Sequence, residues 1–189
     1  KYLAYFPDDE DSATTNFLLA EILFESEQFE QATIEYERTA YGYVDHDKSA
    51  EAGFAAILSY REHEKSLSGA DKAEWHERYL DSGLRFAETY HEHPQSGAVL
   101  TTVAEDLFAQ RQFDRAIAVG QAVVGKQPPV DASLLRTAWT VIAHSRFDIG
   151  HYADAEAAYY RLKAVTPVGD AAAEQEIKDR IASSIYKQG

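Results

Sequence analysis

Histidine is the residue type in this chain best suited to chemistry, because imidazole binds metal ions and transfers protons near neutral pH. His91 and His93 stand just before Pro94, with one residue between them. His63 and His76 flank the stretch from Glu64 to Trp75. Two histidines at this spacing do not share one helix face, and no Asp or Glu triad stands at a fixed distance from them. Near a helix C-terminus, histidine is favourable through the helix dipole alone. The pattern therefore predicts no metal site.

The other candidate motifs for catalysis or ion binding are equally weak. The acidic run Asp8 to Asp11 lacks the ordered spacing and the glycine of a calcium loop, so we expect it to accompany a helix start. The chain has no Cys, and it contains no G-x-S-x-G, Walker A, G-x-G-x-x-G or H-E-x-x-H motif. The sequence thus predicts no catalytic residue and no cofactor, and it indicates a protein that is not an enzyme.

Composition and charge narrow the classes of partner. The 189 residues include 18 Lys and Arg against 32 Asp and Glu, a formal net charge of −14. Nucleic acid and anionic lipid both need a cationic surface, so we expect neither as the main partner. No apolar run of about 18 residues occurs, which argues against direct membrane insertion of this chain. The absent initiator Met leads us to expect a missing natural N-terminus, with a signal peptide or lipid anchor upstream.

The spacing of proline and of apolar residues predicts helices throughout. Pro94, Pro128 and Pro167 are separated by 34 and 39 residues, and proline is excluded from helix interiors at a cost of about 3 kcal/mol. Between these positions apolar residues recur at intervals of three and four, as in Val103 and Leu107. The fold class expected from these signals is all-α.

A helix–turn–helix pattern recurs along the chain. In each copy an aromatic residue precedes an alanine by three positions and follows another aromatic residue by five. A small residue with an apolar neighbour stands upstream of that second aromatic. The three copies are Leu19-Ala20, Phe24, Phe29, Ala32; Val103-Ala104, Phe108, Phe113, Ala116; and Ile142-Ala143, Phe147, Tyr152, Ala155. A period between 20 and 50 residues is typical of repeat proteins.

This pattern resembles tetratricopeptide (TPR) repeats. The stretch from Arg136 to Pro167 matches best, through Trp139, Ile142-Ala143, Gly150, Tyr152, Ala155, Tyr159 and Pro167, whereas Gly120 stands where the family has an aromatic residue. The resemblance implies a right-handed α-α superhelix, a solenoid of antiparallel helix pairs with about nine helices. It implies one array over residues 1–189: the tail of a preceding repeat (1–11), repeats at 12–46, 47–95, 96–130 and 131–169, and the first helix of a following repeat (170–189).

The second repeat is irregular, because its two halves stand too far apart for the family period. The excess falls at Glu64 to Trp75, where we expect a longer connection and extended helices. The repeated alanines are expected where helix backbones approach closely, and the repeated aromatic residues between helices.

The resemblance also implies a concave groove lined by the first helix of each pair. Carried over residue by residue, the expected groove side chains are Phe17, Glu21, Phe24, Glu25, Ile57, Tyr60, Arg61, Glu105, Phe108, His144, Phe147 and Asp148. The groove would be acidic and lined by aromatic residues, suited to a peptide or protein partner with basic and apolar character. In the alternative, the aromatic residues brace adjacent helices.

The expected function is a non-enzymatic scaffold for protein–protein interaction. The repeats are similar to those of bacterial cell-envelope TPR proteins, which implies envelope assembly and a periplasmic, outer-membrane-associated location; a cytoplasmic scaffold is the alternative. The competing hypothesis for function is a structural spacer, or a homo-oligomerising segment, of a longer TPR protein.

Overall fold

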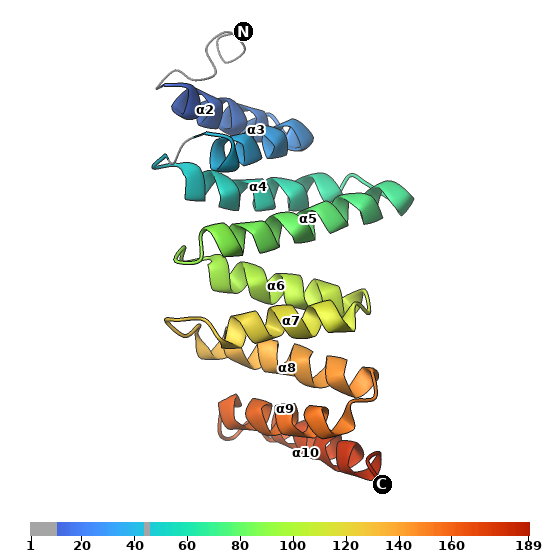
Figure 1. Cartoon of the computed structure of the whole chain (residues 1–189). Helices are drawn as coiled ribbons and strands as arrows, with labels where there is room; N and C mark the ends of the chain where they lie inside the picture. The colour runs from blue at the N-terminus through green and yellow to red at the C-terminus, as the bar shows by residue number, and fades with distance from the viewer. Residues whose placement is uncertain (1–10, 44–45) are drawn as a thin grey trace. The chain divides into compact units, whose positions relative to one another are not determined.

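The computed structural model describes residues 11–43 and 46–189, and within these residues it contains nine α-helices and no strand. The predicted all-helical fold is confirmed. Contacts divide the chain into two compact units, unit 1 (Lys1–Gln95) and unit 2 (Ser96–Gly189). In each unit successive helices alternate in direction and form antiparallel pairs (Figure 1).

The described part of unit 1 contains α2 (Ser12–Glu25), α3 (Phe29–Tyr41), α4 (Ser49–Glu64) and α5 (Gly69–Thr89). Each helix packs on the next one along the chain. Its core includes Phe17, Ala20, Ala32, Tyr36, Ala40, Ala52 and Ala56.

Unit 2 contains α6 (Ser96–Ala109), α7 (Phe113–Val124), α8 (Ala132–Asp148), α9 (Tyr152–Val165) and α10 (Ala171–Tyr186). Here too each helix packs on its successor, and α6 also contacts α8. Asp131 caps α8 through its carboxylate, which accepts hydrogen bonds from the Ser133 and Leu134 amides at 2.9 and 3.0 Å. These hydrogen bonds hold the pKa of Asp131 below its ordinary value.

The ranges predicted as repeats each contain two helices, and the range 170–189 contains α10. The predicted tail at 1–11 lies outside the described residues except for Asp11, which precedes α2. The longer connection expected at Glu64 to Trp75 is wrong, because only residues 65–68 separate α4 from α5. The extended helices predicted for the same stretch are present: α5 has 21 residues, against 13 in α3.

Three helix pairs share one turn geometry. Glu27, Arg111 and Gly150 each occupy the middle of a short connection, with φ of 59°, 62° and 83°. The residue after each of them donates an amide hydrogen bond of 2.9 Å to a carbonyl in the last turn of the first helix, as in Gln112 to Leu107. This is the Schellman arrangement, which requires a left-handed residue. The repeated register seen in the sequence therefore corresponds to a repeated turn.

Small residues lie where helices approach, as predicted. Ala20, Ala32, Ala104, Ala116, Ala143 and Ala155 are all fully buried. Gly120, which replaces the expected aromatic residue, faces α8 so closely that an added Cβ would lie 2.8 Å from Ile142 Cγ1. The fully buried Ile142 side chain therefore fills the space that an aromatic residue would need.

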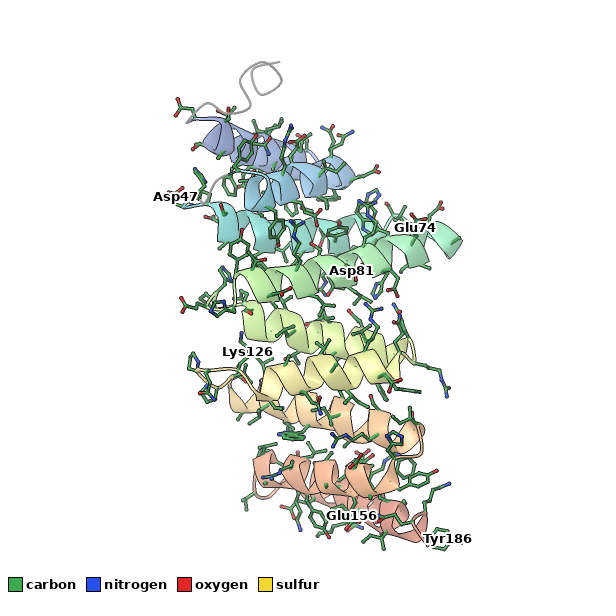
Figure 2. All side chains as sticks on the ribbon, viewed as in Figure 1. Asp47, Glu74, Asp81, Lys126, Glu156 and Tyr186 are labelled. Carbon is green, nitrogen blue, oxygen red and sulfur yellow. The ribbon has the colours of Figure 1, made fainter. Side chains whose placement is uncertain are left out.

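Trp75 packs the extended part of α5 against α4. Its indole nitrogen donates a hydrogen bond of 2.9 Å to the Tyr60 carbonyl, and its ring lies 5.0 Å from that of Tyr60 and 4.5 Å from that of His63. Arg78 covers the indole at 4.6 Å. These contacts explain why the α4–α5 hairpin extends without a long loop. Glu74 lies on the exposed side of α5 (Figure 2).

Several large apolar side chains remain on the surface. Leu18, Ile22 and Ile34 of unit 1 are each more than half exposed, and Tyr186 at the end of α10 is 85% exposed (Figure 2). None of the helices in residues 11–43 and 46–189 combines the length and apolarity that a membrane crossing requires.

Candidate functional site

A pocket of about 420 Å³ lies within unit 2, between α6, α8, α9 and α10. Its floor includes the buried side chains of Val141 from α8, Leu162 from α9 and Ile177 from α10. Polar and charged side chains from α6, α8 and α10 also line it, namely Glu105, Arg136, Thr140, His144, Glu176 and Arg180. An apolar floor with a few polar groups is the usual composition of a ligand site.

Three rings form a row across the pocket. The Phe108 ring of α6 lies 6.0 Å from the His144 imidazole of α8, which lies 5.7 Å from the Tyr159 ring of α9. All three residues line the pocket. Successive rings at this spacing make favourable tilted contacts and hold one another in place. One wall of the site is therefore positioned by three helices at once.

Tyr159 brings an unpaired hydroxyl group to this wall. The residue is fully buried, and its Oη has no hydrogen-bond partner among the residues that the structure describes. Burial raises the pKa of Tyr159 to about 12, so the phenol is a neutral donor at physiological pH. An unpaired buried hydroxyl costs about 1–3 kcal/mol, and a hydrogen-bond acceptor bound in the pocket would offset that cost.

His144 is uncharged at neutral pH. Burial is the largest cause that lowers its pKa, and the positive charge of Arg180 lowers it further, while Glu176 and Asp148 act in the opposite direction. Within the described ranges no hydrogen bond connects the imidazole to a hydroxyl or a carboxylate, so the site lacks a paired nucleophile and base. The ring offers hydrogen bonding and stacking.

The charges around the pocket balance. Arg136 and Arg180 oppose Glu105 and Glu176, two positive against two negative groups. Arg180 lies 4.0 Å from Glu176 on the same helix. Partial removal from water raises the pKa of Glu105, and neighbouring Asp106 adds to the effect. The acidic character predicted for the groove is therefore not a property of this pocket.

The structure brings together some of the predicted groove residues of unit 2. Glu105, Phe108 and His144 all line the pocket. Phe147 does not: its half-buried ring packs edge-on against Tyr152 with centroids 5.3 Å apart. Asp148 is exposed at the end of α8 and acts on the pocket only through its charge.

In unit 1 the predicted groove side chains largely belong to the core. Phe17, Ile57 and Tyr60 are buried at 8%, 3% and 3% exposure.

Their neighbours show the bracing role that the sequence left open. Phe24 packs edge-on against Phe29 and Tyr36 at 5.2 and 6.4 Å, and Glu21 accepts a hydrogen bond from the Tyr36 hydroxyl. Glu25 and Arg61 are exposed.

Sequence reasoning missed Arg136, Tyr159, Glu176 and Arg180 as pocket residues. Its place in the repeat pattern predicts that Tyr159 lies between helices, which is correct for its ring but overlooks its hydroxyl. The signal for α10 was present, because Glu176 occupies the same register position in the predicted last helix as Thr137 does in α8. Both residues line the pocket.

The histidines that opened the sequence analysis have structural environments. His93 packs against the rings of Phe54 and Phe86 at 5.8 and 5.1 Å, and burial lowers its pKa. His76 lies 3.0 Å from a Glu64 carboxylate oxygen. In the part of the chain that the structure describes, no group of three or more His, Asp or Glu side chains is arranged to hold a metal ion.

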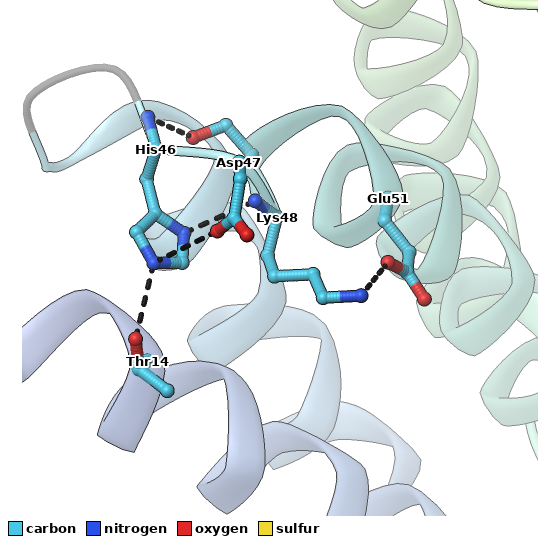
Figure 3. Close-up of polar contacts among 6 residues, drawn as sticks. Thr14, His46, Asp47, Lys48 and Glu51 are labelled. Carbon is cyan, nitrogen blue, oxygen red and sulfur yellow. Dashed lines mark hydrogen bonds and ion pairs between the residues drawn. The ribbon is translucent and has the colours of Figure 1, made fainter.

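A polar cluster at the start of α4 is also accounted for by local structure. The Lys48 amide donates to His46 Nδ1 at 3.1 Å, and His46 Nε2 lies 3.1 Å from Thr14 Oγ1 of α2 (Figure 3). Lys48 Nζ pairs with Glu51 at 2.6 Å (Figure 3). These contacts fix the entry into α4 against α2, and they leave the pocket of unit 2 as the candidate site.

No protein-family model matches this chain, and no curated protein matches it. The TPR resemblance therefore rests on the residue pattern alone.

Proposed function

We propose that this chain is a non-enzymatic helical-repeat scaffold of the TPR type, and that it binds a segment of a partner protein in the pocket of unit 2. The observation that carries the proposal is the buried Tyr159 hydroxyl, unpaired within the described residues, on the wall of an apolar pocket. Polar groups buried without a partner are rare in native proteins, and a bound ligand is one explanation for them.

The dimensions of the pocket suit a short extended segment. A volume of about 420 Å³ falls in the range of ligand pockets, about 300–1,000 Å³. Arg136 and His144 both line it and stand eight residues apart on α8, about 12 Å along the helix axis. An extended chain rises about 3.3 Å per residue, so roughly four residues span that length.

The chemistry of the lining favours binding over catalysis. An apolar side chain is favourably buried against Val141, Leu162 and Ile177. The Tyr159 hydroxyl donates a hydrogen bond to an acceptor of the bound segment. The tilted rings of Phe108 and His144 bring no activated nucleophile. An envelope setting in bacteria belongs to this proposal and is supported by the repeat pattern alone.

A displayed library of random peptides, selected against the full chain, tests the proposal. Thr140→Trp would fill the pocket from α8, whereas Ala157→Trp would add the same bulk on an exposed position of α9 outside the lining. We expect selected peptides to bind the Ala157 variant as they bind the wild type, and to lose at least tenfold in affinity for the Thr140 variant. Failure to select any peptide, or equal binding by both variants, would overturn the proposal.

A structural spacer is the second candidate function, because Phe17, Ile57 and Tyr60 of unit 1 are buried in its core. That arrangement gives these side chains a role in the packing of unit 1. The spacer hypothesis predicts no selected peptide in the same experiment.

A further inference from the structure

Two charged side chains of opposite sign line the pocket without an ion-pair partner. Arg180 and Glu176 approach each other at 4.0 Å, and each offsets the charge of the other. Arg136 of α8 and Glu105 of α6 form no ion pair within residues 11–43 and 46–189. They are the two charges of the lining that remain available to a bound partner.

These two charges lie toward different parts of the pocket. Arg136 is near the start of α8, eight residues before His144. Glu105 of α6 stands one helical turn before Phe108, whose ring lies 6.0 Å from the His144 imidazole. The apolar floor at Val141 lies between Arg136 and His144 along α8. The pocket therefore presents a positive group from α8 and a negative group from α6 beside an apolar floor.

We propose that the segment bound here carries mixed charge: an acidic side chain that pairs with Arg136, a basic side chain that pairs with Glu105, and an apolar residue near them. The inference rests on the proposed function, and it names the chemistry of the partner. In an extended segment, side chains two positions apart lie on the same face. An apolar residue two positions from a charged residue therefore faces the pocket with it and packs on Val141 and Ile177, while a neighbouring backbone carbonyl accepts a hydrogen bond from the Tyr159 hydroxyl.

A uniformly basic or uniformly acidic segment fits less well. A basic segment leaves one cation beside Arg136, and an acidic segment leaves one anion beside Glu105. The carboxyl of Glu105 is already partly removed from water, and this desolvation raises its pKa. A second anion next to it costs more than it would at a fully hydrated position. Like charges in contact across an interface are a common source of specificity.

Three pools of seven-residue peptides with blocked ends test the inference. Each pool has a randomised apolar central residue, flanked two positions away on either side by Asp and Lys, by two Asp, or by two Lys. Binding to the full chain is measured at low and at high salt. We expect the wild type to prefer the mixed pool by about fivefold over either other pool, and to lose that preference in high salt.

Charge-reversal variants predict a change of preference. Arg136→Glu makes both unpaired charges negative, so it should prefer the Lys pool; Glu105→Arg makes both positive, so it should prefer the Asp pool. The uncharged Arg136→Gln should bind the mixed and Lys pools equally. Arg161→Glu, an exposed position of α9 outside the lining, should keep the wild-type preference. Circular dichroism confirms that each variant is folded.

The outcomes separate this inference from the proposed function. Peptides that bind the wild type with no dependence on charge pattern would overturn the inference and leave the pocket as a peptide site. The same holds if the Arg136 and Glu105 variants keep the wild-type preference. If no pool binds the wild type and library selection also fails, the proposed function is overturned together with the inference.

Discussion

Replacing Tyr159 with Phe removes one oxygen atom, and it should change stability and ligand affinity in opposite directions. The Tyr159 side chain is fully buried, and its Oη has no partner among the described residues of the ligand-free chain. Most buried tyrosine hydroxyls are hydrogen-bonded, so that their removal destabilises the fold by about 0.5–1.5 kcal/mol. Here the free energy of unfolding should rise instead.

The expected size follows from the desolvation cost of the hydroxyl. An unpaired buried polar group costs about 1–3 kcal/mol, and the phenylalanine ring keeps the contacts with His144 at 5.7 Å. We expect a gain of about 1 kcal/mol in the ligand-free chain. For a unit of about 60–100 residues, this gain corresponds to a rise in Tm of about 4–8 °C. Affinity for a selected peptide should fall by about twofold to tenfold, because the hydrogen bond to the peptide is lost.

Calorimetry measures the Tm of the ligand-free wild type and variant, and titration with a selected peptide measures their affinities. Tyr160→Phe is the matched control, since Tyr160 is the next residue and is 51% exposed. The control should change neither Tm nor peptide affinity. A Tyr159→Phe variant that is less stable than the wild type would refute the reasoning, because it would show that the hydroxyl is already hydrogen-bonded in the free protein.

Three further predictions concern the fold and its pH dependence. Glu27→Gly should raise the free energy of unfolding by about 0.5–1 kcal/mol in urea denaturation, because Glu27 holds a φ of 59° that glycine adopts without strain. Gly120→Ala should lower it by about 1 kcal/mol in the same assay, since the new Cβ would lie 2.8 Å from Ile142 Cγ1 and this overpacking exceeds the gain in helix propensity. The pKa of Glu105 is raised above its ordinary value of 4.5, so the native state binds this proton more tightly than the unfolded state. Its contribution to stability is therefore present below pH 4.5 and lost as the pH rises through the raised value, and Glu105→Gln should abolish this part of the pH dependence in thermal melts.

The helices and their turns were predictable because they depend on local patterns. Ala20 and Ala32 mark positions where only small side chains fit, and the recurring aromatic residues fix the register of each pair. The turn residue at Glu27 also follows from that register, although its side chain gives no glycine signal. Local rules of this kind act within about one helix pair, so they can be recognised in a single sequence.

The pocket was less predictable, because it depends on contacts between helices distant in sequence. Tyr159 stands at a core position of the repeat, and the sequence does not show that it lines a pocket or that its hydroxyl is unpaired. The same reasoning explains why Tyr60 is buried: in unit 1 the long α5 brings Trp75 against it. A register identifies which face of a helix points inward, and the neighbouring helices decide how much of that face is covered.

The central claim is that the pocket between α6, α8, α9 and α10 holds a partner segment, and methyl NMR tests it most directly. The full chain, labelled at Ile, Leu and Val methyl groups, is titrated with a peptide selected from the library. Our account predicts shifts at Val141 and Ile177, which line the pocket, and none at the exposed Leu18 and Ile22 of α2. Shifts confined to Leu18 and Ile22, with Val141 and Ile177 unchanged, would contradict it.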